Sequence, residues 1–328
     1  MTQIHRILFI RTDRIGDVLM NLAAIRTIRR AYPKAWITLV LDESLNGLLN
    51  AHPDIDEVLF VSIKKFSSEL RERFIFLKKI KAARFDLAIV ANAGKWMHAV
   101  VFLAGIRQRV GWGRKWGFLL SQTLQDDKAV AQRHEIDSNL GLARLLGAPV
   151  WDKTLELPAD PWALKRLEER AQSSGISDKK IIAVHPGTSN PAKRWPEALF
   201  AELCDRLAED PSLQVILIGG PEERASSEEV RRLTRAKSLD WTGQFTLAEL
   251  NAFLRLKNVK ALVSVDSGPV HVAWIGGTPV VALYAQNVPG SDPARWGPRD
   301  GKSEVIFKPI STITVAEVYD ALKRVLAK

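Results

Sequence analysis

The feature that most constrains the fold is the stretch at residues 261–284, which reads ALVSVDSGPVHVAWIGGTPVVALY. It begins with a run of apolar and β-branched residues that is typical of a buried parallel strand. Asp266 or Ser267 can then cap a helix that Pro269 begins, because proline is tolerated in the first helical turn. Two glycines end this helix, and a second apolar run follows. The stretch therefore predicts a strand, a helix and a second strand, which together form a βαβ unit.

The start of this helix is a candidate site for an anion. Free backbone N–H groups at a helix N-terminus attract negative charge. His271 lies in the first turn, where its ring can add a donor. The alternative is an ordinary capped helix that holds no ligand, and the choice depends on the loops elsewhere in the chain.

Strand and helix patterns alternate along the whole chain of 328 residues. We predict strands at residues 6–10, 35–41, 57–61, 86–91 and 109–112, and again at 180–184, 214–219, 261–265 and 279–284. We predict helices at residues 17–32, 162–173, 196–210, 225–236, 247–256, 269–275 and 315–327. This alternation predicts an α/β protein made of two Rossmann-like, doubly wound domains.

The domain boundary is predicted from proline residues. Pro158 and Pro161 break the pattern and mark a linker. We therefore expect a first domain at residues 1–158, a second at 159–312 and a terminal helical segment at 313–328.

Composition places the chain among soluble globular proteins. It is 46% hydrophobic and 26% charged, and no apolar run approaches the roughly 20 residues that span a bilayer. The N-terminal apolar block is too short for a signal peptide. The single cysteine, Cys204, excludes an internal disulfide and lies in an amphipathic helix pattern, so we expect it in the core. These features favour a cytoplasmic location.

The positive charge of the chain is concentrated in two segments of the first domain. The formal net charge is +10. Residues 64–84 hold eight basic and two acidic residues, and residues 95–115 hold five basic residues and no acidic one. Trp96, Phe102 and Trp112 lie among the latter, and Trp116 follows directly. Basic residues with aromatics suggest a membrane face, an anionic glycolipid or nucleic acid as partner, although residues 64–84 can also be a solvated helix face.

Ligands of open α/β sheets bind at the carboxyl ends of the strands, so the loops there are the candidate sites. The first loop, residues 11–17, lacks the GxGxxG pattern of dinucleotide binding. It carries Asp13 and Asp17 instead. Asp17 is either a helix N-cap or a general base.

The loop after the first strand of the second domain has the features of a phosphate site. Thr188 and Ser189 supply hydroxyls, Lys193 supplies a positive charge, and Pro196 begins the next helix. Hydroxyls, a lysine and a helix N-terminus together suit a pyrophosphate. The P-loop pattern GxxxxGK[ST] is absent.

Two further loops of the second domain complete the candidate nucleotide site. Glu222 and Glu223 follow a glycine-rich strand end, where an acid binds ribose hydroxyls in nucleotide-binding folds or simply favours the helix dipole. Thr242 and Gly243 form a short turn that can border a base.

With these loops, the chain resembles the family 9 glycosyltransferases, the heptosyltransferase-like enzymes of lipopolysaccharide core assembly. The resemblance covers nearly the whole chain. It is carried by the segments IGDVLMNLAAIRTIRRAYP, HPGTSNPAKRWPEALFAEL, LIGGPEE, WTGQFTLAEL and VSVDSGPVHVAWIGGTPVVALY. It implies a GT-B fold with two domains facing a cleft, the acceptor in the first and the donor in the second, and the terminal helix packing back on the first domain.

The resemblance also implies an inverting, metal-independent transfer of a sugar, heptose from ADP-heptose in typical members, to a lipopolysaccharide-core-type glycolipid. By motif position, Asp17 matches the catalytic base and Lys193 the lysine on the donor phosphates. The other implied donor-binding residues are Thr188, Ser189, Glu222 (or Glu223 in its place), Asp266, Ser267, Gly268 and His271, and the turn that can border a base adds Thr242 and Gly243. The first loop and the basic aromatic segment supply the acceptor candidates Asp13, Arg14, Lys95, Trp96 and Arg114.

Two departures from the family pattern lie on the donor side. Pro191 and Ala192 stand where acidic residues precede the lysine in typical members, and Ala285-Gln286-Asn287 stands where a Gly-Pro-Thr turn is common. They leave the identity of the sugar and of the base open.

Asp54-Ile55-Asp56 spells the DxD metal motif of a different transferase fold. It lies far in sequence from every phosphate loop, so we interpret it as a solvated turn and predict no metal and no cofactor. The expected partners are a nucleotide sugar, an anionic lipid-linked saccharide and the inner membrane surface, without nucleic acid, and the chain is expected to be a monomer. The alternatives are a nucleotide-sugar epimerase or hydrolase on the same fold, or a non-catalytic protein that binds anionic glycolipid or RNA.

Overall fold

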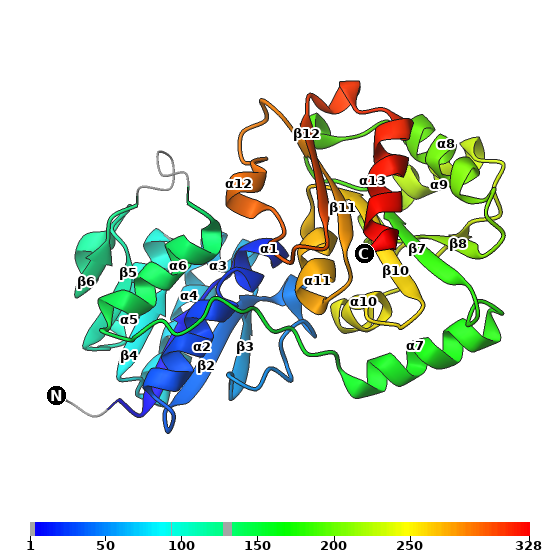
Figure 1. The fold of residues 1–328 in the computed structure, drawn as a ribbon. Coiled ribbons are helices and arrows are strands. Elements are labelled where there is room, and N and C mark those ends of the chain that lie inside the picture. Colours follow the sequence, from blue (N-terminus) through cyan, green and yellow to red (C-terminus); the bar gives the residue numbers. More distant parts are fainter. Residues whose placement is uncertain (1–3, 93, 127–132) are drawn as a thin grey trace. The chain divides into compact units, whose positions relative to one another are not determined.

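The computed structural model describes residues 4–92, 94–126 and 133–328. The chain divides into two compact units, Met1–Glu156 and Leu157–Lys328, two residues from the boundary expected from the prolines. Each unit contains one six-stranded sheet with helices on it (Figure 1). No helix among the described residues is both long and apolar enough to cross a membrane.

The sheet of the first unit is parallel and has the strand order β3-β2-β1-β4-β5-β6. Its strands are β1 (Arg6–Ile10), β2 (Trp36–Asp42), β3 (Glu57–Val61), β4 (Leu87–Val90), β5 (Gln108–Trp112) and β6 (Gln122–Leu124). The two central strands, β1 and β4, are apolar runs, as parallel strands covered on both faces require.

Helices cover this sheet. They are α1 (Ile15–Leu19), α2 (Leu22–Ala31), α3 (Ile63–Ser68), α4 (Leu70–Ala83), α5 (Lys95–Leu103) and α6 (Glu135–Leu145), with single turns η1 (Glu43–Leu45) and η2 (Gly117–Leu119). Helices α3, α4 and α5 share one core with the sheet, in which Phe66, Phe76 and Met97 pack with Leu8 and Val90. Helices α2 and α6 pack against each other (Figure 1).

The sheet of the second unit repeats the same topology. Its parallel order is β12-β11-β10-β7-β8-β9. Counted from the first strand of each unit, both sheets have the order 3-2-1-4-5-6 of doubly wound folds. The strands are β7 (Lys180–His185), β8 (Leu213–Leu217), β9 (Leu239–Asp240), β10 (Val259–Val265), β11 (Val280–Ala285) and β12 (Glu304–Lys308).

The helices of the second unit are α7 (Pro161–Ser173), α8 (Glu197–Leu207), α9 (Arg224–Leu233), α10 (Leu247–Leu254), α11 (Gly268–Gly276), α12 (Pro293–Trp296) and α13 (Val315–Ala327), with single turns η3 (Pro191–Lys193), η4 (Pro221–Glu223) and η5 (Ile310–Thr312). The βαβ unit predicted at residues 261–284 is confirmed as β10, α11 and β11. Cys204 is buried in the core between α8 and the sheet, as expected.

The structure describes the surface that the terminal helix covers in the second unit, and the packing on the first domain that the resemblance implied stays a prediction. Helix α13 belongs to the second unit, where its apolar side is buried against β10, β11, β12 and α8 (Figure 1). Its buried residues, among them Val318, Leu322 and Val325, share one core with Val263 and Leu283 of the second sheet. The amphipathic pattern predicted the helix correctly.

The helix predicted at residues 17–32 is two helices. The Asn21 N–H donates to the Val18 carbonyl oxygen, three residues back. The Asn21 side-chain amide donates to the Asp17 carbonyl oxygen at 2.7 Å. This local competition with the helical hydrogen bonds ends α1 and starts α2. The edge strands β6, β9 and β12 were not predicted, because they are short or lack a continuous apolar run.

Candidate active site

Both sheets have a switch point where the chain connections diverge to opposite sides. In the first unit it lies between β1 and β4, and in the second between β7 and β10. Ligands of doubly wound folds bind at such points, beyond the carboxyl ends of the strands. The loops singled out at Asp13–Asp17, at His185–Lys193 and at Asp266–Gly268 all follow one of these four strands.

In the first unit a buried arginine organises the switch point. The Arg11 guanidinium lies 2.6 Å from Asp17 Oδ1 and 3.1 Å from Asp13 Oδ2. It also donates to the Ala91 carbonyl oxygen at 2.6 Å, at the end of β4. Asn92 donates to Asp13 Oδ1 at 3.2 Å from the same strand end. Arg11 was not among the predicted site residues, although its place directly after a buried strand was the available signal.

Asp17 has the properties of a proton acceptor held in a fixed position. Its side chain is 26% exposed, whereas that of Arg11 is 4% exposed. Burial raises the pKa of the Asp17 carboxyl above its ordinary value; Asp13 and Glu135 raise it further, and Arg11 offsets part of this. A partly buried carboxylate with a raised pKa is a better base than an exposed one. Asp17 lies within α1 and is not its N-cap, which excludes the capping alternative.

The candidate acceptor residues Lys95 and Trp96 lie at the start of α5, whereas Arg14 and Arg114 lie in loops. Trp96 packs edge-on against Trp116, with 5.2 Å between ring centroids, and Arg73 Cζ lies 3.8 Å above its ring. Lys95 Nζ lies 5.3 Å from the centroid of the same ring. Arg114 instead forms an ion pair of 2.7 Å with Asp126. A further candidate, Arg14, is exposed in the loop after β1.

In the second unit the structure brings together two residues predicted for the donor. Lys193 Nζ lies 2.5 Å from Asp266 Oδ2, although 73 residues separate them in the chain. Lys193 comes from η3 after β7, and Asp266 follows β10 directly. Lys193 Nζ also donates to the Gly290 carbonyl oxygen at 3.3 Å. The lysine therefore lies at the switch point, beside the residues that lead into α11.

A buried histidine that the sequence analysis did not assign connects these loops. His185 Nδ1 lies 2.9 Å from Ser264 Oγ and 3.2 Å from Ser267 Oγ. His185 Nε2 lies 2.9 Å from Glu223 Oε2, and it carries the proton because a carboxylate only accepts. The register pairs His185 with Ser264 on neighbouring strands. The ring thus joins the strand ends of β7 and β10 to η4.

The two adjacent glutamates have different roles in this loop. Glu223 accepts from His185 and, at 2.7 Å, from the Gly220 N–H. Burial alone raises the pKa of the Glu223 carboxyl, but these hydrogen bonds outweigh it, so the pKa lies below its ordinary value. Glu222 is exposed. Of the two, Glu222 is the residue whose side chain a ligand can reach directly.

The threonine and serine residues predicted to bind the donor differ in how exposed they are. Ser189 is exposed, and Thr188 Oγ1 accepts from the Asn190 N–H at 3.2 Å. Thr242 is buried, and its hydroxyl donates to Ser227 Oγ at 2.7 Å. Thr242 therefore holds the turn in place through its side chain.

The remaining predicted donor residues lie at two turns. Gly243 adopts a φ of 70°, and its N–H donates to the Gly219 carbonyl oxygen at 2.8 Å. Ser267 is the N-cap of α11 but makes no capping bond through its side chain, and Gly268 is the first helical residue. His271 is buried one turn into α11, where Trp274 Nε1 lies 3.4 Å from its Nδ1.

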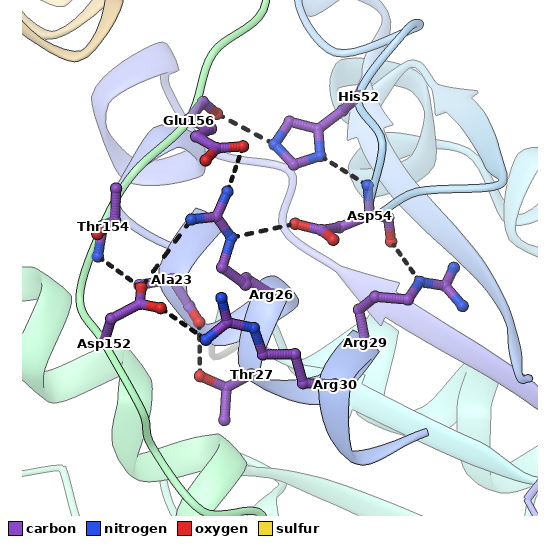
Figure 2. A network of polar contacts seen from close by, with 10 residues as sticks. All are labelled: Ala23, Arg26, Thr27, Arg29, Arg30, His52, Asp54, Asp152, Thr154 and Glu156. Carbon is purple, nitrogen blue, oxygen red and sulfur yellow. Dashed lines mark hydrogen bonds and ion pairs between the residues drawn. The ribbon is translucent and has the colours of Figure 1, made fainter. Parts of the chain in front are cut away.

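The Asp54-Ile55-Asp56 segment is a turn with Asp56 exposed, as predicted, but both of its carboxylates are ion-paired. Asp54 pairs with Arg26 at 3.5 Å, and Asp56 pairs with Arg29 and accepts from the Ile37 N–H at 2.7 Å. Figure 2 shows Arg26 among Asp54, Asp152 and Glu156. The sequence pattern missed this because both arginines come from α2, a separate element. Among the described residues, no group of three or more His, Cys, Asp and Glu side chains is placed to hold a metal ion.

Comparison with known proteins agrees with this geometry. The model of glycosyltransferase family 9 (heptosyltransferase) matches residues 73–317. Lipopolysaccharide heptosyltransferase 2 of Escherichia coli K12 is 28% identical over 314 residues, which cover 92% of this chain and 87% of that protein.

Solved structures extend the likeness to the whole fold. A glycosyl transferase family 9 protein from Veillonella parvula superposes with a TM-score of 0.88 at 23% identity, covering 98% of this chain and 97% of the other. The E. coli ADP-heptose lps heptosyltransferase II superposes with a TM-score of 0.83 at 25% identity, covering 98% of each chain. The chain therefore belongs to glycosyltransferase family 9 (heptosyltransferase) and is a glycosyltransferase with the GT-B fold.

Proposed function

We propose that this enzyme transfers a heptose from ADP-heptose to a glycolipid acceptor of the lipopolysaccharide core type. The observation that carries the proposal is the Lys193–Asp266 pair at the switch point of the second sheet, beside the N-terminus of α11. The names of its relatives support the donor and acceptor, since they include a lipopolysaccharide heptosyltransferase and an ADP-heptose transferase.

The donor diphosphate is proposed to bind at this switch point. Lys193 would exchange its contact with Asp266 for one with the phosphate oxygens, and the N-termini of α8 and α11 would add partial positive charge. These groups would stabilise the charge that develops on the leaving diphosphate. Glu222 is the proposed ribose ligand because it is exposed, whereas Glu223 is held by His185.

The chemical step is proposed to be a single displacement with inversion at the anomeric carbon. Asp17 would take the proton from an acceptor hydroxyl as that oxygen attacks. Arg11 holds the Asp17 carboxylate at 2.6 Å and thereby fixes its orientation. Inversion is tested by NMR of the product, whose anomeric configuration should be opposite to that of the donor; retention would contradict a single displacement.

The donor is tested by thermal shift with ADP-, UDP- and GDP-sugars. A ligand that binds only the folded state raises the melting temperature by mass action. We expect ADP-heptose to raise it and the UDP- and GDP-sugars to leave it unchanged. A shift with another nucleotide alone would assign a different donor. Conversion of the nucleotide sugar without an acceptor would instead favour an epimerase or hydrolase.

The proposed setting follows from the acceptor. We propose that the enzyme works as a monomer in the cytoplasm, against the inner membrane surface that holds its anionic, lipid-linked acceptor, without a cofactor, metal or nucleic acid. Turnover should survive a chelator such as EDTA, and collapse of turnover in EDTA would assign a metal to the reaction.

A further inference from the structure

The outer side of two neighbouring helices of the first unit has an unusual composition. Every exposed residue of α4 and α5 is either apolar or basic. In α4 the exposed apolar residues are Leu70, Phe74, Ile75 and Ala82, and the exposed basic residues are Arg71, Lys78, Lys79 and Lys81. In α5 the exposed residues are Lys95, Phe102 and Leu103. We call these residues the α4–α5 surface.

Large apolar side chains on this surface are exposed to an unusual degree. Leu70 is 75% exposed and Phe74 is 54% exposed. Both lie outside the buried stripe of α4 that Phe76 and Ile80 form. An amphipathic helix would place polar residues there, so the exposed apolar residues are not required by the fold. Exposed apolar residues that gather on one surface indicate an interaction site.

The two helices form one continuous surface. They pack side by side on the same face of the sheet and share its core (Figure 1). Arg73 of α4 reaches over Trp96 of α5, with 3.8 Å between Cζ and the ring centroid. Phe118 of η2, which is 78% exposed, lies next to α5.

The lysines of this surface exceed the acidic residues beside them, which are Glu72 in α4 and Glu69 at its N-cap. Among the residues that the structure describes, Lys78, Lys79, Lys81 and Lys95 form no ion pair with an acidic side chain. Lys78 Nζ lies 4.7 Å from the centroid of the Phe74 ring, so charge and apolar surface are adjacent. Lys and Arg beside Phe and Leu form the composition that binds at the boundary between anionic headgroups and acyl chains.

We propose that the α4–α5 surface docks the enzyme on an anionic lipid bilayer, with the apolar side chains inserted between headgroups and the lysines bound to lipid phosphates. The inference rests on the proposed function, because a lipid-linked acceptor is presented at such a surface. It adds the part of the molecule that makes the contact. Helix α4 would lie along the membrane over about 20 Å, the length of its 14 residues at 1.5 Å each.

Flotation with vesicles of phosphatidylcholine, with and without phosphatidylglycerol, tests this surface. The wild-type chain should float with the vesicles that contain phosphatidylglycerol and not with phosphatidylcholine alone. Leu70→Ser with Phe74→Ser should lower the partition coefficient about tenfold or more by removing inserted apolar area. Lys78→Ser with Lys79→Ser and Lys81→Ser should lower it about 10²-fold.

Matched control variants lie in the second unit. Trp162 is 73% exposed, so Trp162→Ser removes an equally exposed apolar side chain. Lys165→Ser with Lys257→Ser and Lys302→Ser removes the same number of exposed lysines. Both controls should partition like the wild type. Circular dichroism melts of all variants exclude unfolding as the cause of a change.

Three outcomes would overturn the inference: no binding of the wild-type chain to either vesicle, equal binding by the α4–α5 variants and the wild type, or salt-dependent binding to RNA in place of vesicles. Calorimetry with ADP in the absence of vesicles reports on the proposed function separately. If the chain binds ADP but no vesicle, only the docking proposal is contradicted. If it binds vesicles but no ADP, the proposed donor is contradicted.

Discussion

The Arg11 side chain sets the environment of the carboxylate that we assign to catalysis. It contacts both Asp13 and Asp17 and is itself fixed by the Ala91 carbonyl oxygen. A charged hydrogen-bond donor holds a carboxylate in one orientation more firmly than a neutral one does. The same contact opposes the effect of burial on the Asp17 pKa. Arg11 therefore fixes the position of the Asp17 carboxylate and offsets part of the rise in its pKa that burial causes.

Replacement of the proposed base should abolish most of the turnover. We expect Asp17→Asn to lower kcat by about 10²–10⁴, the range typical of general base catalysis. Asp13→Asn is the matched control, because Asp13 also contacts Arg11 but is not assigned the proton transfer. Steady-state kinetics with a folded variant is the measurement. Near-wild-type turnover in Asp17→Asn would remove this residue from the mechanism.

The pH profile should move in opposite directions in two variants. As pH falls through the pKa of Asp17, the base is protonated and kcat falls. Arg11 lowers this pKa and Asp13 raises it. Arg11→Gln should therefore shift the acidic limb of the kcat profile to higher pH, and Asp13→Asn should shift it to lower pH. If both variants kept the wild-type profile, the limb would belong to another group.

Lys193 is the residue on which the donor assignment depends most. A hydrogen bond to a charged group contributes about 1.5–3 kcal/mol, so Lys193→Ala should weaken ADP binding about 10–100-fold. Adenosine, which lacks the diphosphate, should bind the variant and the wild type equally. Lys179→Ala removes another lysine of the second unit, whose ammonium donates to the Pro211 carbonyl oxygen, and should leave ADP binding unchanged. Isothermal calorimetry measures these affinities. Unchanged ADP affinity in Lys193→Ala would contradict the phosphate assignment.

At the scale of elements, the loops after β7, β8 and β10 form one connected unit. Glu223 of η4 packs directly against Gly187 in the loop after β7, where a Cβ atom would lie 2.3 Å from its carboxyl group. The same carboxylate accepts from His185 and from the Gly220 N–H. Glycine at position 187 thus permits the close approach that orders the loop after β7.

Gly187→Ala should disturb this arrangement through Glu223. The added methyl group must displace the Glu223 carboxyl, and such overpacking costs about 1–3 kcal/mol of the free energy of unfolding. We expect a lower melting temperature and weaker ADP binding. In a Glu223→Ala background the same substitution should cost less, because the obstructing group is gone.

Gly276→Ala is the matched control for this prediction. A Cβ atom there would lie 3.5 Å from its nearest neighbour, an ordinary contact. Equal destabilisation by Gly187→Ala in both backgrounds would show that Glu223 is not the obstacle.

At the scale of the whole molecule, the chain builds the same doubly wound topology twice, and each unit has its own core. The single cysteine, Cys204, reports on the second of these cores. Burial raises the pKa of its thiol to about 12. The thiolate, which is the reactive form, is therefore scarce and inaccessible in the folded unit.

Thiol labelling should follow unfolding of the second unit. We expect no reaction of Cys204 with Ellman's reagent in native buffer and full reaction at the urea concentration where the second unit unfolds. Fluorescence of the ten tryptophans, spread over both units, gives the unfolding of the whole chain for comparison. Fast labelling under native conditions would contradict the buried position of this residue.

The sequence by itself determined the class of the fold and the location of the candidate site. Hydrophobic runs bounded by polar loops predicted the central strands and the edge strand β3, with β1 and β3 correct to the residue. These signals are local, because a buried parallel strand needs an apolar run and a helix start needs a cap or a proline. The rule that ligands bind at carboxyl strand ends then selected Asp17, Lys193 and Asp266.

Only the tertiary structure decided which of these residues meet and what holds them. His185 contacts Glu223 and Ser267, and Arg11 contacts the end of β4, across 38 to 82 residues of sequence. The surface covered by α13 and the pairing of the edge strands are equally non-local. Such contacts follow from the order of strands in the sheet, because parallel neighbours are joined by crossovers and not by adjacent residues. Spacing along the chain therefore predicts the elements, and the sheet order assembles the site.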